Sequence, residues 1–281
     1  MGDDVMKVYI TVDMEGVSGV THNQHTSETG NDYSMARQLM TAETNAAIEG
    51  AFEAGATEVV VNDAHGGNGE RNLLLRDLHR EARLLTGRPK DLSQMAGVDA
   101  SFDAALLVGY HVRANSLGVI AHTIKSPFIS ELRINGKPVG EIGTNAYVAG
   151  HFGVPVALVT GDQHTAEEAL DLMPWIETAV VKESVAYTAA LCLHPEKARQ
   201  LIKEKTITAL RRLEEMEPLM ADVPVTFDVE AKDEGMVEMA AWGIPGWERV
   251  GPRHLRFVSD SLATAYRSLI TVIYLGMPHV R

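Results

Sequence analysis

Short apolar runs alternate with longer segments of helical periodicity through the first two thirds of the chain. The apolar runs predict strands at residues 7–13, 58–63, 83–85, 104–109 and 154–160. The periodic segments predict helices at residues 33–54, 73–78, 141–153 and 166–172. This alternation is typical of an α/β fold with a mostly parallel, doubly wound sheet and helices on both faces. The run at 104–109 is apolar throughout, which favours a central strand.

The pattern changes towards the C-terminus. A hairpin is predicted at residues 132–139, where Asn135 and Gly136 stand between strand-forming residues. Beyond about residue 182 we expect a long amphipathic helix at 195–216, a strand at 223–230, and helices at 237–241 and 261–275. We therefore expect a main α/β domain at residues 1–182 and a smaller C-terminal α/β domain at residues 183–281.

The balance of charged residues limits which classes of molecule the protein can bind. The chain has 281 residues, with 25 Lys and Arg against 38 Asp and Glu, so its formal net charge is −13. This sign disfavours binding to nucleic acid or to anionic lipid, because both need a basic surface. The single cysteine, Cys192, can form no internal disulfide, which fits a reducing cytoplasm.

The sequence also argues against export and membrane insertion. Its first ten residues are acidic where a secretory leader needs positive charge. Residues 142–161 carry no charged side chain over the length of a membrane span, but they contain Asn145, His151 and Pro155. We interpret this stretch as a helix, a turn and a buried strand, and we expect a cytoplasmic protein without a membrane partner.

Polar side chains that could carry chemistry follow three of the predicted strands. They are Asp13 and Glu15 after the first strand, Asp63 and His65 after the second, and His111 after the run at 104–109. Because ligands of open parallel sheets bind beyond the carboxyl ends of the strands, we expect these side chains in one crevice. Buried carboxylates gathered in this way would repel one another unless one or two divalent cations bound between them.

Each of these residues alone has a structural explanation. An Asp after a strand often caps the next helix, and a lone His is more often packed than bound to a metal. The convergence of three strand ends on nitrogen and oxygen donors is what indicates a metal site. For Asp63, two roles stay equally open: orienting a ligand or a substrate amine, and capping the strand end.

Four ordered motifs resemble those of the bacterial zinc D-aminopeptidases. The motifs are VYITVDMEGVSG, VNDAHG, LLVGYHVRA and GKPVGEIGTNAYVAG. The resemblance is strongest over residues 7–162 and continues weakly to the C-terminus. It implies hydrolysis of an N-terminal D-amino acid from short peptides, two zinc ions per subunit, and self-association into a ring-like homo-oligomer, a decamer.

The resemblance also implies roles for individual residues. Asp13 would bridge the two zinc ions, and Glu15 would be a terminal ligand. The remaining ligands would be His65, His111 and Glu141. His122, in GVIAHTI, matches the catalytic histidine of the family. Glu141 and His122 rest on the resemblance alone, since neither directly follows an apolar run.

The chemistry that follows is metal-assisted hydrolysis. Two metal ions that share a carboxylate lower the pKa of a bridging water, which gives a nucleophile near neutral pH. His122 could then act as nucleophile, acid or base. Tyr110, Arg113 and Asn145 are close to ligands in sequence and could contact substrate, although Asn145 could equally cap or pack within its own helix. We therefore expect a dinuclear zinc aminopeptidase. The alternative is a non-catalytic α/β module that binds a metal or a small amine.

Other sequence patterns do not indicate an additional catalytic or ligand-binding site. His22 and His25 lie in a polar stretch without a periodic scaffold, which favours a mobile loop over the site. The glycines within residues 66–69 fit neither common phosphate-binding pattern. The sequence contains neither H-E-x-x-H nor G-x-S-x-G, which disfavours a helix-borne zinc site and a serine hydrolase.

Overall fold

The computed structural model describes residues 5–276, and its main sheet has seven strands in the order β3-β2-β1-β4-β7-β8-β9. These strands are β1 (Met6–Val12), β2 (Ala56–Asp63), β3 (Arg83–Leu85), β4 (Ala104–Val108), β7 (Val156–Asp162), β8 (Glu177–Ala186) and β9 (Ala189–Cys192). Neighbouring strands are parallel except β8 and β9, which are antiparallel. The predicted parallel α/β sheet is confirmed, and β4 lies at its centre.

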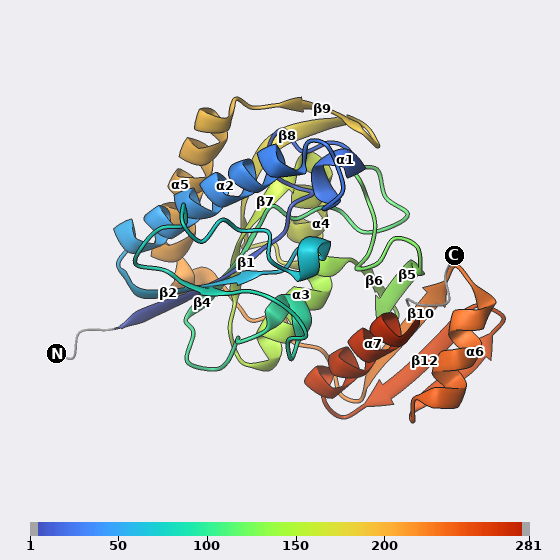
Figure 1. Cartoon of the computed structure of the whole chain (residues 1–281). Coiled ribbons are helices and arrows are strands. Elements are labelled where there is room, and N and C mark those ends of the chain that lie inside the picture. Colours follow the sequence, from blue (N-terminus) through green and yellow to red (C-terminus); the bar gives the residue numbers. More distant parts are fainter. Residues whose placement is uncertain (1–4, 277–281) are drawn as a thin grey trace.

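Helices cover both faces of this sheet (Figure 1). Helices α2 (Tyr33–Glu53) and α5 (Pro195–Arg211) pack together on one face, and α3 (Glu141–His151) and α4 (Gln163–Leu172) on the other. The side chains of β1 alternate between the two resulting cores, with Val8 and Ile10 facing α2 and Tyr9 facing the opposite side. Among the described helices, none has both the length and the apolar composition needed to cross a membrane.

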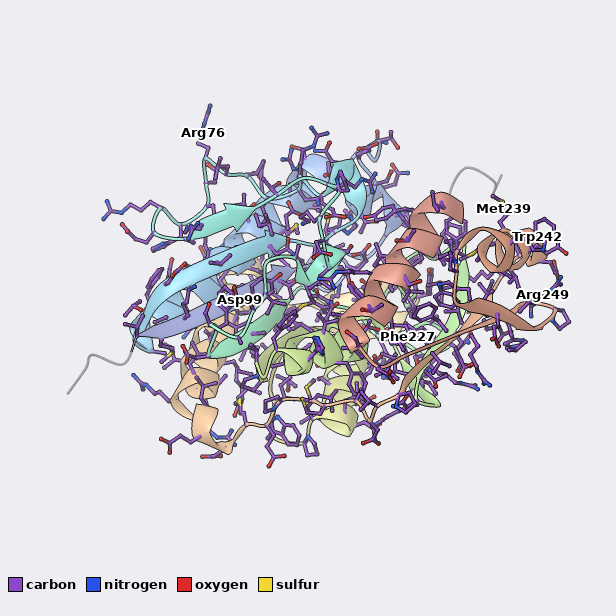
Figure 2. All side chains as sticks on the ribbon, turned by 90° about the horizontal axis from the view of Figure 1, so that it is seen from below. Arg76, Asp99, Phe227, Met239, Trp242 and Arg249 are labelled. Carbon is purple, nitrogen blue, oxygen red and sulfur yellow. The ribbon has the colours of Figure 1, made fainter. Side chains whose placement is uncertain are left out.

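A smaller antiparallel sheet has five strands in the order β11-β12-β10-β5-β6. They are β5 (Ile129–Ile134), β6 (Lys137–Val139), β10 (Val225–Ala231), β11 (Trp247–Gly251) and β12 (His254–Ser259), packed with α6 (Glu234–Gly243) and α7 (Leu262–Gly276). Figure 2 shows Phe227 of β10 beside α7, with Met239, Trp242 and Arg249 at the outer end of this unit. The predicted hairpin is confirmed, because β5 and β6 pair around Asn135 and Gly136, which both have positive φ.

Several local expectations were incomplete. The prediction of a helix at residues 73–78 is wrong, because this segment makes only a single turn. The N–H groups of Asn72 and Leu73, just before that turn, donate to the Asp63 carboxylate. Strands β8, β9, β11 and β12 were not predicted. The remaining short helices are α1 (Asn23–Thr26), η1 (Gly67–Gly69), η2 (Ser93–Met95) and η3 (Leu213–Glu215).

The division of the chain into two domains at residue 182 stays a prediction. Strand β8 contains residues 182 and 183, and β9 and α5 belong with the main sheet. Strands β5 and β6, from earlier in the chain, belong with the smaller sheet.

The strand order reverses between β1 and β4, which creates the crevice for the site. Strands β2 and β3 extend the sheet on one side of β1, whereas β4 and β7 extend it on the other. Gly16, just after β1, lets the two loops touch, because a Cβ there would lie 1.9 Å from the Tyr110 carbonyl oxygen. Its N–H donates to the Gly109 carbonyl over 2.8 Å. The loop that follows β1 is thereby fixed against the loop that follows β4.

Candidate metal centre

Six side chains meet in this crevice, and all six were singled out from the sequence. They form two groups, Asp13, Glu15 and His65 in the first, and His111, His122 and Glu141 in the second. Within each group the potential ligand atoms lie within 4.8 Å of one another. The residues come from the ends of β1, β2 and β4, from the first turn of α3, and from the loop between β4 and β5.

The first group is organised around His65. Its Nδ1 lies 3.1 Å from Asp13 Oδ1 and 3.1 Å from Glu15 Oε2. Its Nε2 lies 2.8 Å from the Thr26 carbonyl oxygen, which can only accept, so Nε2 donates there. Burial lowers the pKa of His65, but the Glu15 and Asp13 carboxylates facing Nδ1 outweigh it and raise the pKa, and a metal ion here would take the place of the Nδ1 proton. A backbone carbonyl that fixes the second nitrogen in this way is typical of metal-binding histidines.

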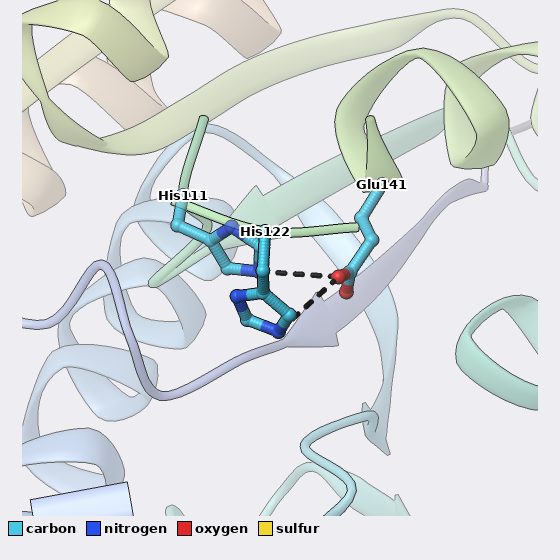
Figure 3. A group of neighbouring side chains, drawn as sticks. All are labelled: His111, His122 and Glu141. Atoms are coloured by element: carbon cyan, nitrogen blue, oxygen red, sulfur yellow. Dashed lines mark ion pairs between the residues drawn. The ribbon is translucent and has the colours of Figure 1, made fainter. Parts of the chain in front are cut away.

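The second group repeats this arrangement. Nδ1 of His111 donates to the Val112 carbonyl over 3.0 Å, and Nδ1 of His122 donates to the Ile120 carbonyl over 2.8 Å. Their Nε2 atoms face Glu141 Oε1 at 3.2 and 3.8 Å (Figure 3). The two rings stack with centroids 4.0 Å apart. His122 is the outer member, with a side chain that is 16% exposed against 1% for His111.

Asp13 lies between the two groups. Its Oδ1 faces His65, and its Oδ2 lies 3.4 Å from Nε2 of His111. One carboxylate therefore presents one oxygen to each group, which is the arrangement that a bridging ligand requires.

The centre contains buried polar atoms without hydrogen bonds. Asp13 Oδ2, Glu15 Oε2 and His111 Nε2 have no hydrogen-bond partner within the described residues. Such atoms are costly in a protein interior unless another group compensates them. Carboxylate oxygens and imidazole nitrogens are ligands that zinc accepts. The donor set therefore fits divalent cations of the zinc type.

The pKa values of these groups diverge strongly. Burial and the neighbouring Glu15 carboxylate raise the pKa of Asp13 to about 7. Burial alone would raise the pKa of Glu141, but the His111 and His122 imidazoles outweigh it and lower the pKa to about 2. Burial, together with His111, lowers the pKa of His122. A cation between these groups would favour ionised carboxylates and neutral imidazoles throughout.

Comparisons with known proteins agree with this chemistry. The model of the D-aminopeptidase peptidase family M55 matches residues 6–271. A D-aminopeptidase of Bacillus subtilis (strain 168) is 38% identical over 273 residues, which cover 97% of this chain and 98% of the relative. The chain belongs to the D-aminopeptidase family. The enzyme class inferred from the sequence motifs is thereby confirmed.

A solved structure allows the fold of the present chain to be compared as well. It is described as the Zn-dependent D-aminopeptidase DppA from Bacillus subtilis, a self-compartmentalizing protease. It matches with a TM-score of 0.93 at 38% identity, over 97% of this chain and 98% of the other. The predicted fold class is therefore confirmed by a relative of nearly the same length.

A buried polar network beneath the centre of this D-aminopeptidase was missed by sequence reasoning. Glu141 Oε2 accepts from Gln94 Nε2, and Gln94 Oε1 accepts from Asn145 over 3.1 Å. Asn145 also donates to the Tyr110 hydroxyl over 2.9 Å. Tyr110, Asn145 and Arg113, which the sequence left open as substrate contacts, do not line the cavity at the centre. Gln94 lies in a short turn, where no local pattern marks it.

Asp63 supports the backbone near His65. Its carboxylate accepts from the N–H groups of Asn72 and Leu73 over 2.5 and 2.8 Å, and from the Asn72 side chain over 2.7 Å. The Asn72 amide also donates to the His65 carbonyl over 2.8 Å. These bonds match the strand-end alternative for Asp63 and tie the strand end to the loop at His65.

Lys182 holds the loop that carries Glu15. Its Nζ is buried and donates to the carbonyls of Glu15, Val17 and Val20, the last two over 3.1 and 2.6 Å. Burial lowers the pKa of Lys182 to about 8. A single cation on β8 therefore fixes three backbone carbonyls after β1.

The polar loop before α2 lies over the cavity, as the sequence predicts. It contains the short helix α1, and its residues Asn23, Thr26 and Ser27 line the cavity. Nδ1 of His25 accepts from the N–H groups of Thr21 and His22 over 3.2 Å. Among the described residues, His22 and His25 belong to neither group of metal ligands. These two histidines organise the loop itself.

Glu43 of α2 supports the loop after β1, and its burial predicts that the stability of the protein depends on pH. Its Oε1 accepts from the Ser18 N–H over 2.9 Å, and its Oε2 has no hydrogen-bond partner in the described structure. Burial raises the pKa of Glu43 from 4.5 to about 8. Between these values the folded state binds one more proton than the unfolded state, so the free energy of unfolding falls as pH rises and levels off above about 8.

We expect Glu43→Gln to remove this contribution to the pH dependence of the free energy of unfolding. The amide oxygen of glutamine can still accept from the Ser18 N–H, and the amide carries no charge. Relative to wild type, the variant should gain a few kcal/mol in free energy of unfolding between about pH 5 and about pH 9. Urea denaturation at both pH values measures this gain. Glu49→Gln, an exposed position on the same helix, is the matched control. An equal effect of Glu43→Gln at both pH values would contradict the prediction.

Proposed function

We propose that this D-aminopeptidase is a dinuclear zinc enzyme that removes an N-terminal D-amino acid from short peptides. The observation that carries the proposal is the Asp13 carboxylate, which has one oxygen towards each group of ligands. In this proposal Asp13 would bridge the two ions, Glu15 and His65 would complete the first site, and His111 and Glu141 would complete the second. The Zn-dependence of the solved relative supports the choice of metal.

The protein residues around the ions have separate tasks. When bound, zinc supplies a water of lowered pKa and a Lewis acid for the scissile carbonyl. His122 is the proposed catalytic residue, because among the six it is the one with a partly exposed side chain that lines the cavity. Its Nδ1 is held by the Ile120 carbonyl, which leaves Nε2 facing the centre for proton transfer to the leaving amine.

Metal analysis combined with a stereospecific assay tests the proposal. We expect two zinc ions per subunit, hydrolysis of a D-alanyl amide, and little hydrolysis of the L-alanyl amide. A chelator should abolish the activity and added zinc should restore it. If the zinc-loaded protein cleaves neither amide, the proposal fails and the non-catalytic binding module takes its place. A preference for the L-amide would overturn the D-specific part alone.

We also propose that the chain assembles into a ring-like homo-oligomer, a decamer, in the cytoplasm. The solved relative is described as a self-compartmentalizing protease, which supports assembly. Large apolar side chains are exposed on the β8–β9 hairpin, where Val185 and Leu191 lie, and at Trp242 on α6. Such exposed side chains favour burial against other subunits. Light scattering on the purified protein measures the subunit number, and a monomer would overturn this part.

A further inference from the structure

The carboxylate of Glu168, on α4, joins the two segments that carry the proposed ligands of the second site. Its Oε2 accepts from the Arg113 N–H over 2.7 Å, and its Oε1 accepts from the Gly140 N–H over 3.2 Å. Arg113 follows His111 by two residues, and Gly140 directly precedes Glu141. A side chain that belongs to neither group of potential ligands therefore holds the backbone beside both of these ligands.

The hydrogen bond to Arg113 acts on the peptide group that orients the His111 ring. The carbonyl of this peptide group belongs to Val112, and it accepts from His111 Nδ1 over 3.0 Å. The N–H of the same group belongs to Arg113 and donates to Glu168. Because a peptide group is planar and rigid, fixing its N–H also fixes the direction of its carbonyl. Glu168 thereby orients the His111 ring through one peptide group, with Nε2 towards the second site.

The hydrogen bond to Gly140 acts on the start of α3. Gly140 is the N-cap residue of this helix, and its carbonyl accepts from the N–H and the hydroxyl of Thr144 over 3.0 and 2.7 Å. A Cβ built on Gly140 would lie 2.7 Å from Arg113 Cβ and 2.9 Å from Glu168 Oε1, so a larger residue would push these segments apart. Glycine thus lets the first turn of α3, which carries Glu141, lie against the loop after β4.

Helix α4 is itself anchored to the loop that carries His122. Its N-cap residue, Asp162, is buried and accepts from the Thr165 N–H through Oδ1 and from the Val119 N–H through Oδ2, both over 2.8 Å. Val119 directly precedes Ile120, whose carbonyl holds Nδ1 of His122. The helix also packs against α3 and β7 (Figure 1). One helix therefore supports the backbone of the whole second group.

The first group is held by other contacts. Lys182 of β8 fixes the loop that carries Glu15, and the Thr26 carbonyl fixes the His65 ring. Within residues 5–276, the Glu168 carboxylate accepts hydrogen bonds from the segments of the second group alone. The loss of this carboxylate should therefore disturb one metal site and spare the other.

We propose that Glu168 is a positioning residue for the second metal site, where it sets the orientation of His111 relative to Glu141 through the backbone of Arg113 and Gly140. This inference rests on the proposed dinuclear zinc function and adds to it a residue outside the ligand set. Glu168 contacts neither an ion nor the substrate in this account. Groups that orient a metal ligand contribute about 10- to 100-fold to metal affinity.

Stepwise zinc affinities test the inference without any measurement of turnover. The two zinc dissociation constants of the full-length protein are measured by competition with a chelator of known affinity. We expect Glu168→Ala to weaken one of the two by about 10- to 100-fold and to leave the other within about threefold. Glu168→Gln keeps one acceptor oxygen, so its loss should be smaller, and it replaces Glu168→Ala in the comparison if the alanine variant does not fold.

The affected ion is assigned in backgrounds that lack one proposed ligand. With Glu15→Gln, which weakens the first site, Glu168→Ala should still cause its full loss of affinity. With Glu141→Gln, which weakens the second site, Glu168→Ala should change the affinity of the remaining ion by less than about threefold.

The matched control is Glu167→Ala, which removes the neighbouring carboxylate on α4. The side chain of Glu167 is 70% exposed and pairs with His164, so both zinc constants should stay at the wild-type values. Equal weakening of both ions by Glu168→Ala, or no weakening of either, would overturn the positioning role. A wild-type protein that binds fewer than two zinc ions would instead overturn the proposed dinuclear function, so the two failures are distinguishable.

Discussion

Asp13→Asn is expected to lose at least one of the two proposed zinc ions and to lower kcat/KM for a D-alanyl amide by about 10³-fold or more. The reason is geometric, because Oδ1 of Asp13 faces His65 and Oδ2 faces His111. An asparagine keeps one oxygen, but its NH₂ group cannot be a ligand, and the negative charge between the ions is lost. Zinc per subunit, measured by plasma emission, and steady-state kinetics on the same preparation give both quantities.

The control for this variant is Glu28→Gln. Glu28 lines the same cavity, but it belongs to neither group of potential ligands. We expect Glu28→Gln to keep two zinc ions and to retain kcat/KM within about threefold, since an exposed carboxylate away from the ions contributes little. Full zinc content and full activity in Asp13→Asn would rule out the bridging role of Asp13.

His122→Ala is expected to lower kcat by about 10²- to 10⁴-fold while zinc content stays at the wild-type level. The side chain is the outer member of the second group, with Nε2 3.8 Å from Glu141 Oε1, whereas Nε2 of His111 lies at 3.2 Å. Removing a proton-transfer group slows the chemical step and leaves the ligand set complete. A kcat measurement at saturating substrate separates this effect from weaker binding.

His254→Ala is the matched histidine control, because His254 lies on β12 in the smaller sheet with a side chain that is about half exposed. Its activity should equal that of wild type. Two outcomes of His122→Ala contradict the catalytic assignment in different ways. Retained activity means that His122 takes no part in the reaction, and a parallel loss of zinc means that it is a ligand of the second ion.

Much of the candidate site could be predicted because parallel strands end at one edge of a sheet. Asp13, Glu15, His65 and His111 each follow a strand, so the alternation of apolar and polar residues was enough to gather them. Glu141 begins a helix, and His122 lies in a loop. The packing of that helix and loop against β1 and β4 is a property of the whole fold, so the family resemblance was needed to find them.

The limits of the fold prediction have similar causes. Strand β8 was missed because Lys182 and Glu183 interrupt its apolar pattern, and Lys182 is buried only because three backbone carbonyls receive its ammonium. Strand β5 pairs with β10, and no local pattern connects segments so distant in sequence. Gln94 was not predicted for the same reason, since it is placed by its contact with Glu141, which is distant in sequence.

The six side chains of the centre are spread over residues 13–141, so they leave the ribosome at different times during synthesis. A nascent chain has Asp13, Glu15 and His65 available early, but the second group is complete only after the first turn of α3 has left the ribosome. In the proposed function the first site could therefore form once β1 and β2 have paired, whereas the second site requires β4 and α3 as well. An ion at the second site would bind to a sheet that already contains β4, and it would stabilise the finished fold by mass action.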